Sequence, residues 1–425
     1  MIASSGQCAH GSAHGLLADV LRPLPLETFF DEYWGRAPVH VPGWRGKFAE
    51  CLPWHAVNRV LAEHRLEHPR LRLFKDGILV EREQYVRFTT IRAGIDTPIP
   101  RLLASEFVDL LRDGATMVLD GVDELYGPLS EFAKSLEGVF HEYIRVNAYA
   151  AWRTARGFDI HWDDHDVLIL QVAGRKDWAI HGSTYQYPLT SNRRHDTTPP
   201  AAPVWTGLLS DGDLLYIPRG WWHVAHPLDE PSLHLTVSIT SGTGIDLMLW
   251  LVEQLKGATA MRQDLPKFSG LDEQKAHAAL LRSAVTAALD DDVVRRYLHH
   301  RDVTAYGRPT FTLPGSASPT FTLTPSTRIR LVPPRPLTVT ATGEGYSVDG
   351  NDTRWRLSAE AKAVVETLGD HVSRTVHELA AVHPTVPHAV LYACLLSLIR
   401  EGLLTIVDVE TAVPSFSRPS TVAPG

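Results

Sequence analysis

The 425-residue chain has little of three features that would each indicate a particular class of protein. It has three cysteines, Cys8, Cys51 and Cys394, an odd number spread over the whole length, which fits neither a disulfide framework nor a paired-cysteine zinc site. No apolar run approaches the roughly 20 residues that a membrane-spanning helix needs. The formal charge of -8 shows no basic excess, so a dedicated nucleic-acid-binding protein is not expected.

The composition is that of a globular protein, with 44% hydrophobic and 21% charged residues. The first residues, Met1 to Gly15, lack the apolar stretch of a signal peptide. We therefore expect a flexible leader over residues 1–24 and a cytoplasmic protein. The length predicts roughly two to three domains.

The first half of the chain predicts a mainly β domain over residues 25–244. Between Ile144 and Ile239, short runs of Val, Ile, Leu and Trp are separated by Gly, Pro and Asp, a pattern typical of an antiparallel barrel or jelly roll. Helical spacing precedes it at Leu129 to Phe140, and Leu71 to Val80 predicts a strand pair that turns at Asp76-Gly77. This domain is the catalytic candidate.

The second half changes character after residue 244. Helical stretches at Ile245 to Leu255 and Asp272 to His300 predict a helical segment over 245–305, followed by a Pro- and Thr-rich linker over 306–327. Residues 328–410 predict a strand, three helices and a closing strand, which is the order of a winged-helix domain. Residues 411–425 predict a disordered tail. From Arg301 to Gly425 the chain carries 11 basic and 11 acidic residues, so DNA binding by this domain is not expected.

One short motif could hold a metal. In His161-Trp162-Asp163 the two polar side chains are two residues apart, so on a strand they project from the same side. The chain has a second such triplet, His300-Arg301-Asp302, at the end of a predicted helix, where this spacing does not bring side chains together. The triplet alone is therefore weak evidence.

A second segment supplies the missing ligand. Gly212-Asp213 predicts a turn, Leu214 to Ile217 a buried strand, and Pro218 with Gly220 another turn, after which His223 begins a strand. Two histidines and one carboxylate on one face of an iron leave three positions open, enough for a bidentate co-substrate together with dioxygen. His161, Asp163 and His223 are the candidate ligands.

These segments resemble a known family. The pattern G-x5-P-x-G-x2-H over Gly212 to His223 resembles the second cupin motif, and HWDDHDVLILQVAGRKDW resembles the metal-binding strand of the JmjC-related ribosomal oxygenases. Similar stretches (YWGRAPVHV, LRLFKDG, LLRDGATMVLDGV, SLHLTVSI) extend the resemblance over most of residues 25–245. It implies a JmjC-type cupin domain, a double-stranded β-helix, followed by a helical dimerisation segment and a C-terminal winged-helix-like domain.

The resemblance also implies roles for individual residues. His161, Asp163 and His223 would bind Fe(II), and Lys176 would pair with the distal carboxylate of 2-oxoglutarate, because an unpaired buried charge is costly. The alternative for Lys176 is an exposed turn residue. Asn147 is a weaker candidate for the co-substrate pocket, because a barrel Asn can equally satisfy backbone groups.

Neighbouring polar side chains are not expected to bind the metal. Asp164 and Asp166 would point to the opposite face of a regular strand as solvated carboxylates. His165 would lie roughly 13 Å along the strand from His161, too far to share one ion. Two further histidines, His226 and His234, lie outside the Pro-Gly turn.

The implied activity is that of a 2-oxoglutarate-dependent dioxygenase. It would use Fe(II), 2-oxoglutarate and O2 to hydroxylate a protein or peptide side chain, of a ribosomal protein or a biosynthetic peptide, with succinate and CO2 as co-products. The chain departs from the family in AAWRTARGFDIHWD, where Arg153 and Arg156 replace a Pro- and Gly-rich approach, which leaves the substrate open. Alternatives are a small-molecule hydroxylase and a non-catalytic winged-helix binding protein.

The helix at Ile245 to Leu255 predicts self-association. Its sequence IDLMLWLVEQL is apolar on nearly every face, so a single core cannot easily cover it. A two-fold dimer is the commonest way to bury such a helix, and the resemblance implies the same pairing. The expected partners are thus a second copy of the chain and a protein or peptide substrate, with no membrane.

Overall fold

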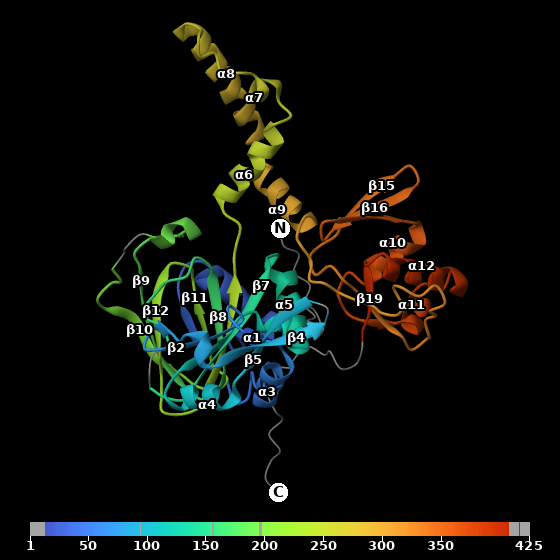
Figure 1. Cartoon of the computed structure of the whole chain (residues 1–425). Helices are drawn as coiled ribbons and strands as arrows, with labels where there is room; N and C mark the ends of the chain where they lie inside the picture. Colours follow the sequence, from blue (N-terminus) through green and yellow to red (C-terminus); the bar gives the residue numbers. More distant parts are fainter. Residues whose placement is uncertain (1–12, 94, 155–156, 195–197, 408–415, 417–425) are drawn as a thin grey trace. The chain divides into compact units, whose positions relative to one another are not determined.

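The computed structural model describes residues 13–93, 95–154, 157–194, 198–407 and 416. The chain divides into two compact units (Figure 1). Unit 1 comprises Met1–Thr240, Asp370–Val372 and Val407–Gly425, and unit 2 comprises Ser241–Gly369 and Ser373–Ile406. The first division falls close to the domain boundary predicted at residue 244.

Unit 1 is built on two antiparallel sheets. The large sheet has the order β1-β11-β8-β13-β7-β6-β2-β3 and the small sheet the order β10-β9-β12. Their strands are β1 (Val39–Val41), β2 (Leu71–Lys75), β3 (Ile78–Leu79), β6 (Thr116–Leu119), β7 (Ile144–Ala151), β8 (Asp166–Ala173), β9 (Lys176–Ser183), β10 (Pro203–Leu209), β11 (Leu214–Ile217), β12 (Trp221–Pro227) and β13 (Ser232–Ile239). The antiparallel arrangement predicted for residues 144–239 is confirmed.

Strand β8 explains how the two sheets pack. Its alternate residues Val167 and Ile169 join a core that includes Trp178 of the small sheet, whereas Leu168 and Leu170 join the larger core beneath the helices. Successive strand residues point to opposite faces, so a strand covered on both sides is apolar throughout. The apolar run of β8 is therefore the signature of a central strand.

The helices and short helical turns of unit 1 precede strand β9, except η4, which lies between β9 and β10. They are α1 (Ala13–Leu21), α2 (Leu26–Thr28), α3 (Trp54–Glu63), α4 (Ala104–Arg112) and α5 (Gly127–Phe140), with a π-helical turn η1 (Phe29–Tyr33) and 3-10 turns η2 (Arg82–Gln84), η3 (Val122–Glu124) and η4 (Thr190–Arg194). Pro128 suits the first turn of α5, where no backbone donor is needed, and His141 ends the helix in the left-handed conformation. Its residues Leu129, Phe132 and Leu136 are fully buried, as their spacing predicted.

Helix α1 corrects the prediction of a flexible leader over residues 1–24. Leu17, Val20 and Leu21 are fully buried in the core of unit 1, because their spacing of three and four places them on one face. Residues 1–12 of that leader lie outside the described residues. In the predicted tail, Phe416 is described, and its ring packs edge-on to two other core phenylalanines with an exposed fraction of 2%.

The hairpin of β4 (Val86–Ala93) and β5 (Ile95–Leu102) was not predicted. Strand β5 contains Pro98 and Pro100, which weaken any strand pattern because proline cannot donate to a ladder. In a two-stranded sheet each strand has an unpaired edge, and proline is tolerated there.

Unit 2 begins with the helices α6 (Gly244–Leu255), α7 (Thr259–Arg262), α8 (Leu271–Ala288) and α9 (Val293–Val303). Thr243 caps α6 and exchanges hydrogen bonds with Asp246. The single helix predicted over residues 272–300 is wrong, because acidic residues 290–292 separate α8 from α9. No helix among the described residues is long and apolar enough to span a bilayer.

The rest of unit 2 contains two small sheets and three helices. One sheet has the order β18-β14-β19, with β14 (Arg328–Leu331), β18 (Arg374–Thr375) and β19 (Leu404–Ile406), and the other is formed by β15 (Thr338–Thr342), β16 (Gly345–Gly350) and β17 (Thr353–Leu357). The helices are α10 (Ala359–Thr367), α11 (Val376–Val382) and α12 (His388–Arg400). The predicted order of strand, three helices and strand is present, and the sheet β15–β17 is an addition to it. Leu391, Leu395 and Leu398 of α12 are buried, as expected of an apolar helix.

Candidate metal centre

Two of the predicted ligands lie directly opposite each other. His161 and His223 form an isolated antiparallel bridge, in which the backbone N of His223 donates to the oxygen of His161 at 2.7 Å and the reverse bond measures 3.1 Å. Directly opposed residues of an antiparallel pair project from the same face. The ring centroids are consequently 4.5 Å apart.

The third ligand is held by the turn before β12. The backbone N of Gly220 donates to the oxygen of Asp163 at 2.8 Å, and Gly220 has a positive φ of 83° that favours glycine. Asp163 Oδ2 lies 3.6 Å from His223 Nε2, and ligand atoms of His161, Asp163 and His223 all lie within 4.8 Å of one another. Among the described residues, this is the group of His, Cys, Asp and Glu side chains that could hold a metal ion.

Hydrogen bonds fix the tautomers of both histidines. His161 Nδ1 lies 2.8 Å from the carbonyl oxygen of Asp159, and His223 Nδ1 lies 3.0 Å from that of Trp221. A carbonyl only accepts, so each neutral ring donates from Nδ1 and keeps a lone pair at Nε2 for a metal. Burial, together with the nearby His161, lowers the pKa of His223 to about 4, so its ring is neutral at physiological pH.

Lys176 lies in the same cavity and is not an exposed turn residue. Its side chain has an exposed fraction of 2%, and its Nζ donates to His234 Nδ1 at 3.0 Å. Burial lowers the pKa of Lys176 to about 7, and no carboxylate of the described residues forms an ion pair with it. A buried amine whose neighbour is a neutral imidazole would be stabilised by an anion placed beside it.

The cavity that holds these groups has a volume of about 90 Å³. It is lined from alternate positions of four strands, by Val167 and Ile169 of β8, Lys176 and Trp178 of β9, His223, Ala225 and Pro227 of β12, and His234 and Thr236 of β13. Thr116 Oγ1 and Trp178 Nε1 also face buried surroundings, without a hydrogen-bond partner among the described residues. Buried polar atoms are normally hydrogen-bonded, so a water or a polar ligand in the cavity would satisfy these two.

The donor set fits a divalent transition metal. Two imidazoles and one carboxylate on one side of an ion suit non-haem iron and leave the opposite side open to the cavity. The amine of Lys176 and the unpaired polar atoms suit a small anion next to that ion. One cavity therefore combines a group of side chains that could hold a metal ion with a buried amine that suits an anion.

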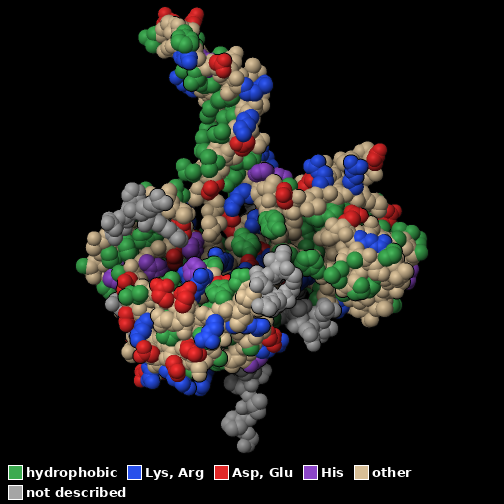
Figure 2. Space-filling view, viewed as in Figure 1, with side chains coloured by type: hydrophobic (Ala, Val, Ile, Leu, Met, Phe, Trp, Pro, Cys, Tyr) green, Lys and Arg blue, Asp and Glu red, His purple; other side chains and the backbone are tan. Residues whose placement is uncertain are grey.

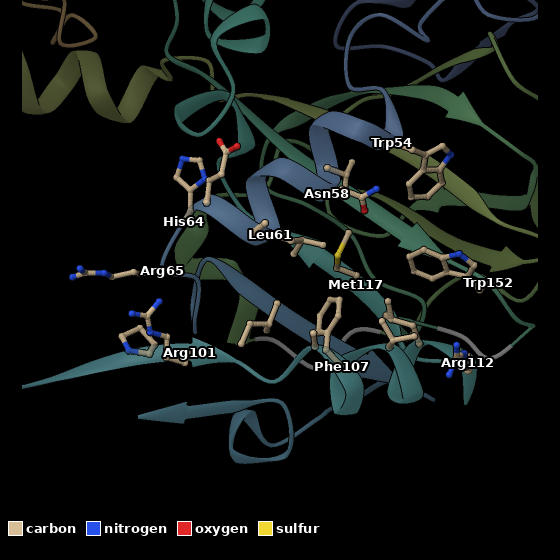
Figure 3. Close-up of a pocket in the computed structure, with 18 of the residues that line it drawn as sticks. Trp54, Asn58, Leu61, His64, Arg65, Arg101, Phe107, Arg112, Met117 and Trp152 are labelled. Carbon is tan, nitrogen blue, oxygen red and sulfur yellow. The ribbon is translucent and has the colours of Figure 1, made fainter. Parts of the chain in front are cut away.

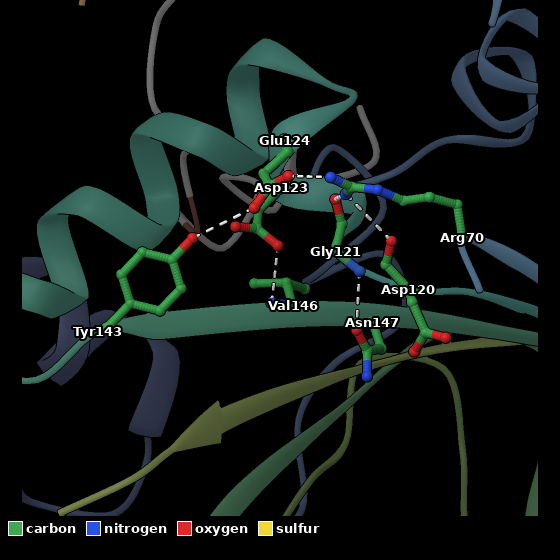
Figure 4. Close-up of polar contacts among 8 residues, drawn as sticks. All are labelled: Arg70, Asp120, Gly121, Asp123, Glu124, Tyr143, Val146 and Asn147. Carbon is green, nitrogen blue, oxygen red and sulfur yellow. Dashed lines mark hydrogen bonds and ion pairs between the residues drawn. The ribbon is translucent and has the colours of Figure 1, made fainter. Parts of the chain in front are cut away.

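Asn147 lies outside this group. Its Oδ1 accepts a hydrogen bond from the backbone N of Gly121 at 2.9 Å, and it does not line the metal cavity (Figure 4). Gly121 is left-handed, with a φ of 61°, at the start of the turn η3. This geometry agrees with the alternative given for Asn147 from the sequence, in which its side chain satisfies a backbone group.

The other polar residues singled out from the sequence have separate places. The prediction that Asp166 is a solvated carboxylate is wrong. Its exposed fraction is 5%, and it accepts a hydrogen bond from Tyr216 at 2.6 Å. His165 Nδ1 contacts Asp164 at 3.1 Å, outside the ligand group. Arg153 is exposed and pairs with Asp229, while Arg156 lies outside the described residues.

Sequence reasoning missed several residues of the cavity wall. Tyr149 stacks on His234 with centroids 4.9 Å apart, and Phe158 packs between Tyr149 and His161. A signal existed in SLHLTVSI, where His234, Thr236 and Ser238 alternate with apolar residues. That alternation predicts a strand with one polar face turned to a cavity.

Comparison with known proteins identifies the domain that carries this site. A family described as JmjC domain matches residues 128–247. These residues are similar to JmjC domains. The resemblance noted from the sequence is thereby confirmed, and all three candidate ligands and Lys176 fall within the matched JmjC residues.

Similar proteins include two that carry functional names. The bifunctional lysine-specific demethylase and histidyl-hydroxylase NO66 of Drosophila persimilis is 27% identical over 227 residues, covering 52% of this chain and 31% of the relative. Ribosomal oxygenase 1 of Gallus gallus is 27% identical over 227 residues, covering 52% of this chain and 35% of the relative. The chain thus spans about a third of the length of these relatives.

Solved structures support the fold over most of the chain. The ribosomal oxygenase YcfD of Escherichia coli matches with a TM-score of 0.53 at 16% identity, covering 90% of this chain and 98% of that one. The same protein in complex with cobalt and 2-oxoglutarate matches with a TM-score of 0.52 at 14% identity, over the same shares. At these identities the likeness concerns the fold: a mainly β JmjC/cupin-like domain with added helices.

Proposed function

We propose that the chain is an Fe(II)- and 2-oxoglutarate-dependent dioxygenase that hydroxylates a protein or peptide side chain. The observation that carries this proposal is the combination, in one cavity, of a two-histidine, one-carboxylate group with a buried lysine that pairs with no carboxylate of the described residues. A metal site alone fits many activities, whereas this second feature matches a co-substrate that brings its own negative charge.

Each residue has a defined task in this proposal. His161, Asp163 and His223 would hold Fe(II), with both rings oriented by their Nδ1 hydrogen bonds. Lys176 would donate to the distal carboxylate of 2-oxoglutarate, a charge-assisted hydrogen bond that its present neighbour His234 cannot match. Iron and 2-oxoglutarate together supply the oxidising chemistry that places oxygen from O2 in a C–H bond and yields succinate and CO2.

The size of the cavity favours a substrate that reaches in from outside. Its volume of about 90 Å³ lies below the range of about 300–1,000 Å³ typical of pockets for drug-sized ligands, so beside 2-oxoglutarate it leaves no room for a whole small-molecule substrate. A single side chain of a polypeptide could enter while the rest stays outside. Exposed Tyr185 and Tyr187 flank the turn of Gly220, and such aromatic side chains are frequent in protein interfaces.

The names of similar proteins support the same class of enzyme, a protein hydroxylase. The fly relative is named a histidyl-hydroxylase, the chicken relative a ribosomal oxygenase, and the bacterial structure contains 2-oxoglutarate. We therefore propose a ribosomal protein as the first substrate to test, and a biosynthetic peptide as the second.

The test is succinate formation from 2-oxoglutarate with mass spectrometry of the substrates. We expect turnover that requires Fe(II), a mass gain of one oxygen on a protein or peptide, and loss of both in His161→Ala and Asp163→Ala. His300→Ala is the matched control, because His300 belongs to the second H-x-D triplet on α9 in unit 2. Full turnover by His161→Ala would remove the metal assignment.

Two alternatives predict different results. A small-molecule hydroxylase would form succinate with Fe(II) but leave every peptide and ribosomal protein unchanged in mass. A non-catalytic winged-helix binding protein would form no succinate at all. Its domain has balanced charge, and α12 is buried along Leu391, Leu395 and Leu398, which does not favour contact with nucleic acid.

We also propose a homodimer formed through unit 2. Ile245, Met248, Leu249 and Val252 form one stripe along α6, and their exposed fractions are 55%, 39%, 63% and 52%. Helix α8 packs beside α6 and has no buried residue of its own. Figure 2 shows hydrophobic side chains gathered along this helical segment. Such a continuous apolar surface is typical of a protein interface.

Light scattering of the full chain tests the dimer. The double change Leu249→Asp and Val252→Asp should give a folded monomer, because both side chains are exposed in the single chain. Trp250 is unsuitable for this test, since it packs against Tyr297 and His300. Gln254→Asp, on the same helix, is the control that should stay dimeric. A monomeric parent chain at micromolar concentration would contradict the proposal.

A further inference from the structure

A large groove lies in unit 1, apart from the metal cavity. It has a volume of about 950 Å³ and lies among helices α3 and α4, strand β5 and the end of β7 (Figure 3). Its floor is apolar, and Val57, Phe107 and Met117 there are almost completely buried. Trp54 and Trp152 meet at one end, with ring centroids 5.7 Å apart.

Strand β6 separates the groove from the metal cavity. Thr116 lines the metal cavity, whereas the next residue, Met117, lines the groove. Neighbouring strand residues point to opposite faces, so the two sites lie on opposite faces of the large sheet. The groove is therefore not an extension of the proposed co-substrate site.

The end of the groove opposite the two tryptophans carries two arginines. Figure 3 shows Arg65 and Arg101 at this end, beyond Leu61, and the acidic lining residue Glu63 is paired with Arg59. Both Arg65 and Arg101 are exposed, and neither side chain forms a hydrogen bond or ion pair with any described residue. The arginines near the tryptophans differ, because Arg112 pairs with Asp109 and Arg153 with Asp229.

The hairpin β4–β5 adds a second indication of an anion. Arg101 lies directly opposite Arg87 across the two strands, and Arg87 likewise has no acidic partner among the described residues. Like charges placed opposite each other destabilise a strand pair. An anion bound at this end of the groove would offset that repulsion.

We propose that this groove binds a long-chain carboxylate, with the chain on the apolar floor and the carboxylate on Arg65 and Arg101. The groove has the size and lining of a small-molecule pocket, mainly hydrophobic and aromatic with a few charged groups. Charge complementarity fixes the orientation, since the guanidinium groups without partners are at one end. A neutral chain would leave them unpaired, and a cationic chain would be repelled.

Calorimetric titration of the full chain with dodecanoate, below its micelle concentration, tests this proposal. We expect saturable one-to-one binding, and much weaker binding of dodecanol, which has the same chain but no charge. Excess 2-oxoglutarate with Co(II) should leave dodecanoate binding unchanged, because the metal cavity lies on the other face of the sheet. Competition between the two would place dodecanoate in the metal cavity and overturn the proposal.

Paired variants separate the head-group site from general charge effects. Arg65→Gln with Arg101→Gln should weaken dodecanoate binding by about tenfold or more, since each removes a charge-assisted hydrogen bond. Arg145→Gln is the control, because Arg145 is an exposed arginine of unit 1 on β7 that does not line the groove. Both variants change exposed residues, so folding should be unaffected.

An apolar variant tests the chain-binding floor. Val108 lines the groove with an exposed fraction of 40%, so Val108→Asp can be introduced without a buried charge. We expect it to weaken dodecanoate binding as strongly as the arginine pair does. Equal binding by all variants, or binding of an acidic peptide without binding of dodecanoate, would refute a carboxylate site in this groove.

Discussion

Replacement of Lys176 by methionine should stabilise the protein at neutral pH and weaken its binding of 2-oxoglutarate. Each pKa unit corresponds to about 1.4 kcal/mol, so the lowering from 10.5 to about 7 opposes the charged amine by roughly 5 kcal/mol. At pH 7 the amine of the folded chain is about half neutral, which leaves a folding cost on the order of 4 kcal/mol. Methionine has a similar length and does not incur this cost.

The gain is reduced by the neighbouring imidazole. His234 Nδ1 would lose its hydrogen-bond donor, which costs about 1–3 kcal/mol in a buried site. We therefore expect Lys176→Met to raise the free energy of unfolding by about 1–3 kcal/mol at pH 7. Urea denaturation followed by circular dichroism measures this quantity directly.

The pH dependence gives the sharper test. The pKa of Lys176 is lower in the folded chain than in the unfolded chain, so the folded chain binds fewer protons between about pH 7 and 10.5, and its stability rises with pH there. The advantage of Lys176→Met should shrink by about 3 kcal/mol between pH 7 and pH 10. Lys256→Met is the control, because Lys256 is an exposed lysine paired with Glu253 and should change little. The reasoning would be refuted if Lys176→Met were less stable than the parent chain at pH 7. It would also be refuted if the difference in free energy of unfolding between the two did not change with pH.

Three further substitutions test individual contacts. Tyr216→Phe should lower the free energy of unfolding by about 1–3 kcal/mol in urea denaturation, because it removes the hydroxyl that donates to the buried Asp166 carboxylate. Asn147→Ala should cost about 1–2 kcal/mol by removing the acceptor of Gly121 N, with no change in the 2-oxoglutarate concentration needed for turnover; a raised requirement would restore its co-substrate role. Phe416→Ala should cost about 3 kcal/mol in the same denaturation assay, and no loss would show that the contribution of this ring to the core is negligible.

Much of the candidate metal site could be predicted because its residues belong to short local patterns. The H-x-D triplet supplies two polar side chains, the Pro-Gly turn before His223 supplies a third, and the family resemblance joined them. The residues that form the cavity wall could not be predicted from local patterns. Tyr149 and His234 meet through the pairing of β7 with β13, and nothing local to either residue indicates that partner.

The missed elements have physical reasons as well. The β4–β5 hairpin contains prolines, and the β15–β17 sheet is short and polar, so neither shows a strong strand period. Asp166 was assigned to solvent by strand alternation alone. It is buried because Tyr216, on the paired strand β11, donates to it, and Gly35 N donates in turn to Tyr216 at 2.7 Å.

The register of β12 relates the position of the candidate metal ligand His223 to that of the buried amine of Lys176. A bulge between Trp221 and His223 turns the histidine toward His161, and at the other end of the same strand Pro227 lies opposite Lys176. Alternate residues of β12 and β9 between these points face the cavity, so the distance between metal and amine is set by the pairing of two strands. A slip of one residue would turn His223 and the wall of the anion site away together. The position of His223 and that of the buried amine therefore depend on the same strand register.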